Sequence, residues 1–140
     1  MKVLRADHIA IAVKDIEQAS MLYKEILGLE FVGEEVISEN NVKIASFKCG
    51  ELNIELIQQL HEGDSSVGKF IEENGEGLYH IAFEVDNLAD TIESLTAKNF
   101  RFQSPCPMKG AKNSTIAFLE ASCANGTVLE FKEFLGKNGS

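Results

Sequence analysis

The stretch HIAIAVKDI at residues 8–16 returns in similar form as HIAFEVDNL at residues 80–88, 72 residues further along the chain. The first part of each copy is rich in Ile, Val, Phe and Ala, which is typical of a buried β-strand. An Asp or Asn follows each strand, and both residue types favour the start of a helix. The repeat therefore predicts two related halves, each beginning with a strand and a helix.

Each half continues with a helix and three further strands. Apolar residues at helical spacing from Ile16 to Ile26, and again from Leu88 to Leu95, predict one amphipathic helix per half. The strands that follow are expected at about 29–36, 42–48 and 52–58, and then at about 100–104, 114–120 and 126–133. Each half is thus β-α-β-β-β, which makes the chain an α+β protein.

The length of 140 residues fits one domain, residues 1–140. We expect a first module at about 3–58, a linker with a short helix at 59–76, and a second module at about 77–134. The polar end, residues 136–140, is expected to fray.

Composition excludes several classes of protein. The formal charge of −9 opposes binding to nucleic acid or anionic lipid, because both require a basic face. No apolar run approaches the roughly 18 residues of a membrane span, and charges interrupt the N-terminal residues too early for a signal peptide. The sequence therefore predicts a cytoplasmic protein. Three scattered cysteines are predicted to be reduced thiols.

Two histidines and two glutamates occupy repeat-related positions. His8 and His80 begin the repeated strands, while Glu55 and Glu130 lie in the closing strands NIEL (53–56) and VLEF (128–131). A lone His in a strand is commonly a core residue, and a lone Glu commonly faces solvent. The duplication of both favours a shared site, reached when the two halves pair. Two imidazoles and two carboxylates suit a divalent ion such as Ni, Co, Mn, Zn or Mg.

Longer motifs carry a resemblance to a known family. They are DHIAIAV (7–13), YKEILGL (23–29), IEL (54–56) and DSSVGKFIEENGEGLYHIAF (64–83). Over about residues 5–134 the chain resembles the vicinal oxygen chelate (glyoxalase/bleomycin resistance/dioxygenase) superfamily, and within it the methylmalonyl-CoA epimerases. The resemblance implies two paired βαβββ modules that form a cup-shaped mixed sheet with helices outside, usually in a homodimer. It also implies one divalent metal ion at His8, Glu55, His80 and Glu130.

The resemblance further implies a reaction. In the epimerases the metal binds oxygens of methylmalonyl-CoA, and removal of the α-proton gives an enolate. Inversion needs two carboxyl groups, one on each side of the carbon. Glu130 is one of them by resemblance. In some epimerases the other is a Glu on the third strand of the first half, where this chain has Ile44, so we expect Glu55 to take that role.

A second departure from the family pattern concerns a loop in the second half. The family tends to have Gly-Ala-His-Gly followed by a strand ending in Phe-Leu-His-Pro, whereas this chain has KGAKNS (109–114) and FLEA (118–121). We expect Lys109 and Lys112 to bind the phosphates or the carboxylate of a substrate. The alternative interpretation is a flexible basic surface loop.

Three other functions within the superfamily compete with the epimerase. Glyoxalase I shares the ligand set but acts on a glutathione hemithioacetal, and residues 59–77 favour the epimerase. Antibiotic-binding members bind no metal and usually lack the complete ligand set, so four intact ligands favour an enzyme. Ring-cleaving dioxygenases use two His and one Glu, typically in longer chains. The expected partners are therefore an acyl-CoA or glutathione-linked substrate and a second copy of this chain.

Overall fold

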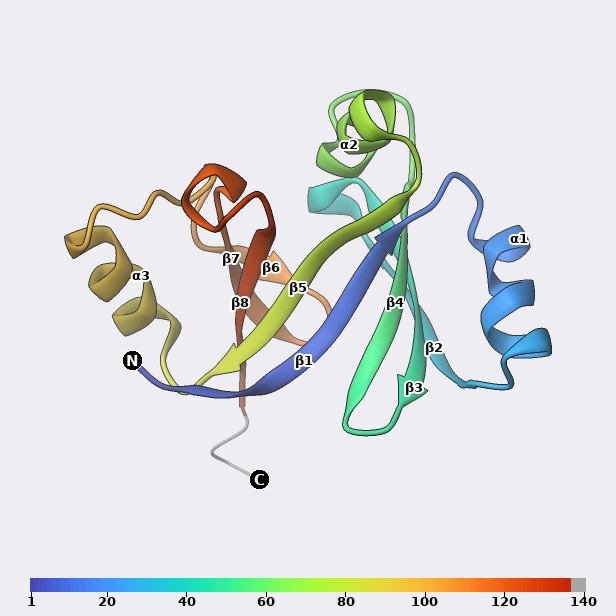
Figure 1. Ribbon diagram of the computed structural model, residues 1–140, viewed down its shortest axis with the longest axis horizontal. Coiled ribbons are helices and arrows are strands. Elements are labelled where there is room, and N and C mark those ends of the chain that lie inside the picture. Colours follow the sequence, from blue (N-terminus) through green and yellow to red (C-terminus); the bar gives the residue numbers. More distant parts are fainter. Residues whose placement is uncertain (137–140) are drawn as a thin grey trace. The chain divides into compact units, whose positions relative to one another are not determined.

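The computed structural model describes residues 1–136, which divide into two compact units (Figure 1). The N-terminal unit is His8–Tyr79, and the C-terminal unit consists of residues 1–7 together with the described residues from His80 onward. The strand β1 (Val3–Ala12) contributes residues to both units. Within residues 1–136 no helix is long and apolar enough to span a membrane.

The strand order in the N-terminal unit is β2-β3-β4-β1. Strands β1 and β4 are parallel, whereas β4 with β3 and β3 with β2 are antiparallel. The other elements of this unit are β2 (Glu30–Ile37), β3 (Val42–Cys49), β4 (Leu52–Gln59), α1 (Ile16–Ser20), which continues as a π-helix (Met21–Ile26), and α2 (Ser66–Asn74).

Helix α1 covers one face of this part of the sheet. It begins at the predicted position because the Asp15 side chain accepts a hydrogen bond from the amide of Gln18, at 3.2 Å. Ile16 packs into a core cluster with Phe47 of β3 and Leu56 of β4. Because strand side chains alternate between faces, Glu55, the neighbour of Leu56, lies on the face opposite the helix.

The C-terminal unit repeats this arrangement in the order β1-β5-β8-β7-β6. Strands β5 and β8 are parallel, and β8 with β7 and β7 with β6 are antiparallel. The side chain of Asn87 caps α3 by accepting a hydrogen bond from the amide of Asp90, at 2.9 Å. The elements are β5 (Gly77–Val85), α3 (Leu88–Ala97), β6 (Met108–Gly110), β7 (Ser114–Leu119) and β8 (Val128–Phe134).

The predicted α+β fold with two βαβββ modules is confirmed, but the strand predicted at 100–104 is wrong. That segment makes one isolated bridge, between Phe102 and Leu119, and the corresponding strand is β6 at Met108–Gly110. Pro105 and Pro107 lie between the bridge and β6, and a proline has no N–H to donate to a neighbouring strand. Of the predicted frayed end, residues 137–140 lie outside the described residues.

A buried charged cluster lies in the C-terminal unit. Lys132 on β8 is 1% exposed, and its Nζ lies 3.6 Å from Oδ2 of Asp7. The guanidinium of Arg5 lies 3.0 Å from Asp7 and 3.5 Å from Glu84, and Glu84 is the cross-strand partner of Lys132. Two cations thus balance two carboxylates, as buried charges require.

We expect the Lys132→Met substitution to lower the free energy of unfolding by about 3–5 kcal/mol, because it leaves buried carboxylates without their buried cation. Urea denaturation of both proteins measures the difference. Lys43→Met is the matched control, since the Lys43–Glu34 pair, at 3.5 Å, has side chains 29% and 41% exposed. Its effect should stay within about 1 kcal/mol. Equal effects of the two substitutions would show that the cluster does not stabilise the fold.

Candidate metal centre

A buried His–Glu pair lies in the N-terminal unit. Nε2 of His8 on β1 is 3.3 Å from Oε1 of Glu55 on β4, and the side chains are 2% and 4% exposed. The parallel register pairs Glu55 with Ala10, two residues after His8. Side chains two residues apart on a strand share a face, so the register brings this histidine and this glutamate together.

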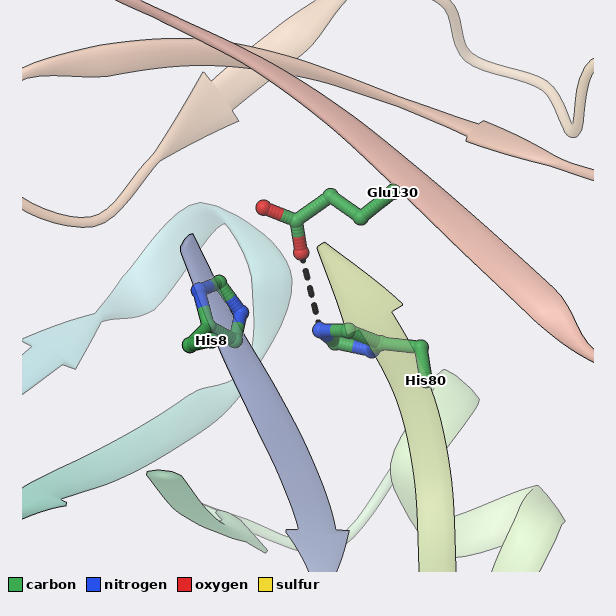
Figure 2. A group of neighbouring side chains, drawn as sticks. All are labelled: His8, His80 and Glu130. Atoms are coloured by element: carbon green, nitrogen blue, oxygen red, sulfur yellow. Dashed lines mark ion pairs between the residues drawn. The ribbon is translucent and has the colours of Figure 1, made fainter. Parts of the chain in front are cut away.

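The C-terminal unit contains the equivalent pair. Nε2 of His80 on β5 lies 2.9 Å from Oε1 of Glu130 on β8, with side chains 3% and 5% exposed (Figure 2). Here the register pairs Glu130 with Ala82, again two residues after the histidine. The ring of Phe118 packs edge-on against His80, with centroids 5.2 Å apart. The four residues chosen from the repeat therefore form two pairs of the same construction, one in each unit.

The chemistry of these side chains fits a divalent metal ion. Imidazole nitrogen and carboxylate oxygen are the ligands that Zn, Ni, Co and Mn accept in proteins. All four side chains are buried and project from strands, which hold ligands more precisely than loops do. Each unit can therefore supply one nitrogen and one oxygen ligand.

The surroundings of Glu55 differ from those of Glu130. The cross-strand partner of Glu55 on β3 is Ser46, whereas Phe118 is the partner of Glu130 on β7. Ile44 lies two residues from Ser46 and is 7% exposed. Ile44 thus lies on the same face as Glu55, as an apolar residue.

The two lysines predicted to bind substrate lie in the C-terminal unit, and both are exposed. Lys109 is on β6, and Lys112 is in the turn between β6 and β7 with a left-handed φ of 57°. Hydrogen bonds hold this turn: the hydroxyl of Ser114 donates to the carbonyl of Ala111 at 2.6 Å, and the amide of Leu135 donates to the carbonyl of Asn113 at 2.9 Å. The segment is therefore an ordered edge hairpin.

Sequence analysis missed the charged cluster beside the two pairs. Asp7 directly precedes His8, and Lys132 lies two residues after Glu130. The repeat contained a sign of this charged cluster. The residues equivalent to Glu84 and Lys132 in the first half are Ala12 and Ile57, which also pair across neighbouring strands. An apolar pair in one half and a charged pair in the other marks this position as distinct.

Comparisons with known proteins agree on one family. The sequence profile of the Glyoxalase/Bleomycin resistance protein/Dioxygenase superfamily matches residues 7–118. The chain is 37% identical over 129 residues to the uncharacterized protein YqjC of Bacillus subtilis, covering 92% of this chain and 91% of that protein. It is 34% identical over 131 residues to the mitochondrial methylmalonyl-CoA epimerase of Bos taurus, covering 92% and 74%.

A solved structure of Streptomyces coelicolor methylmalonyl-CoA epimerase, in complex with 2-nitronate-propionyl-CoA, superposes with a TM-score of 0.89. It is 30% identical, and the match covers 96% of this chain and 97% of that one. Profile, sequence relatives and structure thus lead to the same conclusion, which the motifs had predicted: the chain belongs to the glyoxalase/bleomycin resistance protein/dioxygenase superfamily.

Proposed function

We propose that this protein is a metal-dependent epimerase that acts on methylmalonyl-CoA or a closely related acyl-CoA by moving the proton α to the thioester carbonyl. The observation that carries the proposal is the pair of equivalent buried His–Glu contacts, one in each half of the chain. The kinship with methylmalonyl-CoA epimerases supports the substrate class.

We propose that both pairs bind one divalent ion, Co, Ni, Mn, Zn or Mg, through His8, Glu55, His80 and Glu130. The equal register of the two halves and the complementary ligands support a shared site. The chain also passes from one unit to the other at this point: Asp7 is the last residue of the first segment of the C-terminal unit, and His8 is the first residue of the N-terminal unit. When bound, the ion supplies a positive charge that stabilises the negative charge developing on the thioester oxygen.

The proton is moved by side chains of this protein. Glu130 takes the α-proton from one face of the carbon, and a second carboxyl group returns a proton to the opposite face. The resemblance to the epimerases predicts Glu55 for that second role. Lys109 and Lys112 bind the phosphates of the CoA carrier, because a lysine ammonium group binds phosphate as a point charge.

A homodimer in the cytoplasm completes the proposal. The N-terminal unit exposes four apolar side chains in the π-helix and directly after it, namely Met21, Leu22, Ile26 and Leu27. Strands β2 and β6 end the strand orders of their units and so leave sheet edges. Both features support association with a second copy.

The deciding experiment assays the purified, metal-loaded protein with methylmalonyl-CoA and with the glutathione hemithioacetal of methylglyoxal in parallel. Epimerisation of the first substrate with no turnover of the second is the expected result. Turnover of the hemithioacetal alone would establish a glyoxalase I-like lyase. Binding without turnover or α-deuterium exchange would indicate a non-catalytic binding protein.

Metal stoichiometry tests the shared site. The metal-stripped protein, dialysed against Co²⁺, is expected to hold one ion per chain, and His8→Ala and His80→Ala should each abolish tight binding, because each removes a ligand of the same ion. His61→Ala is the control, since His61 lies outside both pairs. Two ions per chain, or one pair that still binds after the other is disrupted, would show that the pairs act separately.

Glu130→Gln keeps an oxygen ligand of nearly the same volume but loses the basic carboxylate. We expect the epimerisation rate to fall by about 10²–10⁴-fold, the usual contribution of general-base catalysis, while metal content falls much less. Metal analysis must accompany the rates, because a lost ion would imitate a lost base. Full activity with the metal retained would remove Glu130 from the proposed chemistry.

Lys109→Ala and Lys112→Ala test the binding of the carrier. Each should raise KM for the CoA substrate with kcat nearly unchanged, because a phosphate contact far from the reacting carbon stabilises the bound ground state and the transition state equally. Lys98→Ala, at the end of α3, is the control for loss of an exposed cation. KM values equal to that of the control would leave the two lysines as ordinary surface residues.

A further inference from the structure

Epimerisation requires an acid or base on each face of the reacting carbon, and this requirement can be tested against the N-terminal unit alone. The face that carries His8 and Glu55 is the relevant one, because the opposite face packs against α1. Among the described strand residues of this unit, the register gives this face five titratable side chains: His8, Glu30, Glu35, Lys48 and Glu55. Three of them are carboxylates: Glu55, Glu30 at the start of β2 across from Lys48, and Glu35 across from Ile44.

Glu35 lies on β2 directly across from Ile44 of β3. Cross-strand partners share a face and lie about 4.5–5.5 Å apart, so the Glu35 side chain stands beside Ile44 on the face of Glu55. Its neighbour Glu34 pairs with Ala45, which belongs to the core cluster on the α1 face. Glu34 and Glu35 therefore project from opposite faces of the same strand.

The row of cross-strand partners that starts at Glu55 carries small side chains on β3 and β2. Ser46 is the partner of Glu55, and Gly33 is the partner of Ser46 on β2. A Cβ built at Gly33 meets no heavy atom within 4 Å. Little side-chain bulk therefore stands in the row of Glu55, and Ile44 is the larger side chain in the next row, beside Glu35.

We propose that Glu35 is the second acid/base of the epimerisation, while Glu55 serves as a metal ligand. This inference rests on the proposed function and deepens it. The α-C–H bond breaks as Glu130 takes the proton, and the electron pair moves into the enolate. The carboxylic acid of Glu35 then gives its proton to the opposite face, forming the new C–H bond. In the reverse direction Glu35 is the base and Glu130 the acid, and exchange with solvent restores their protonation.

The two-base arrangement makes a prediction that a structural role for Glu35 does not. Each pure epimer of methylmalonyl-CoA is incubated in D₂O with the metal-loaded enzyme, and both inversion and α-deuterium uptake are measured against an enzyme-free control. Glu35→Gln should slow epimerisation by about 10²–10⁴-fold. One epimer, whose proton faces Glu130, should still exchange with solvent without inverting, and the other should not exchange.

Two further variants sharpen the experiment. Glu34→Gln, on the other face of β2, should epimerise like the wild type. Adding Ile44→Glu to Glu35→Gln should restore inversion, because it returns a carboxylate to the same face one strand away.

Four results would overturn the inference. The first three concern Glu35→Gln: epimerisation at the wild-type rate, α-deuterium exchange of both epimers, or loss of exchange for both epimers with the metal still bound. The fourth is that adding Ile44→Glu to Glu35→Gln fails to restore inversion. A wild-type enzyme that exchanges neither epimer overturns the proposed function as well, so the two failures are distinguishable.

Discussion

The parallel pairing of β1 with β4 and of β5 with β8 is the constraint on which both halves depend. It places each histidine two residues before the strand partner of its glutamate. Apolar burial on the other face fixes this register: Leu56 and Phe131, the neighbours of the glutamates, belong to the two helix-covered core clusters. A slip of one residue would send the glutamates into those clusters and expose the apolar side chains, at a large cost in free energy.

The repeat made most of this arrangement predictable from sequence. Matching strands and capping residues predicted the order of elements, and the repeat singled out the His and Glu positions, because these features depend on local pattern and spacing. The change in offset from 72 to 75 residues is explained by the short 3₁₀ turn Ala121–Cys123 between β7 and β8. The second strand of the second half was predicted at 100–104 because that segment contains apolar residues. The prolines that follow it prevent the pairing from continuing there. The buried charge of Lys132 depends on partners distant in sequence, which strand periodicity alone does not reveal.

The two halves use their equivalent positions differently. In the C-terminal unit Phe118 packs on the histidine, and a charged cluster fills the positions beyond the ligands. In the N-terminal unit the equivalents of Phe118 and Lys132 are Ser46 and Ile57. One half is thus crowded around its His–Glu pair, and the other has small and apolar side chains there.

The place of Glu35 also follows from the cost of burying charge. Ile44 is 7% exposed and lies on the face of Glu55, so a carboxylate there would be buried near a second one, and like charges near each other raise the cost of ionising both. Glu35 lies on the edge strand β2 and is only partly buried, so water can solvate its charge before substrate arrives. The chain therefore has a partly buried carboxyl group, Glu35, on the same face as Glu55, while the buried position beside it, Ile44, is apolar. Among the described residues of this half, His8–Tyr79, the one buried carboxylate is then Glu55, and His8 lies beside it at 3.3 Å.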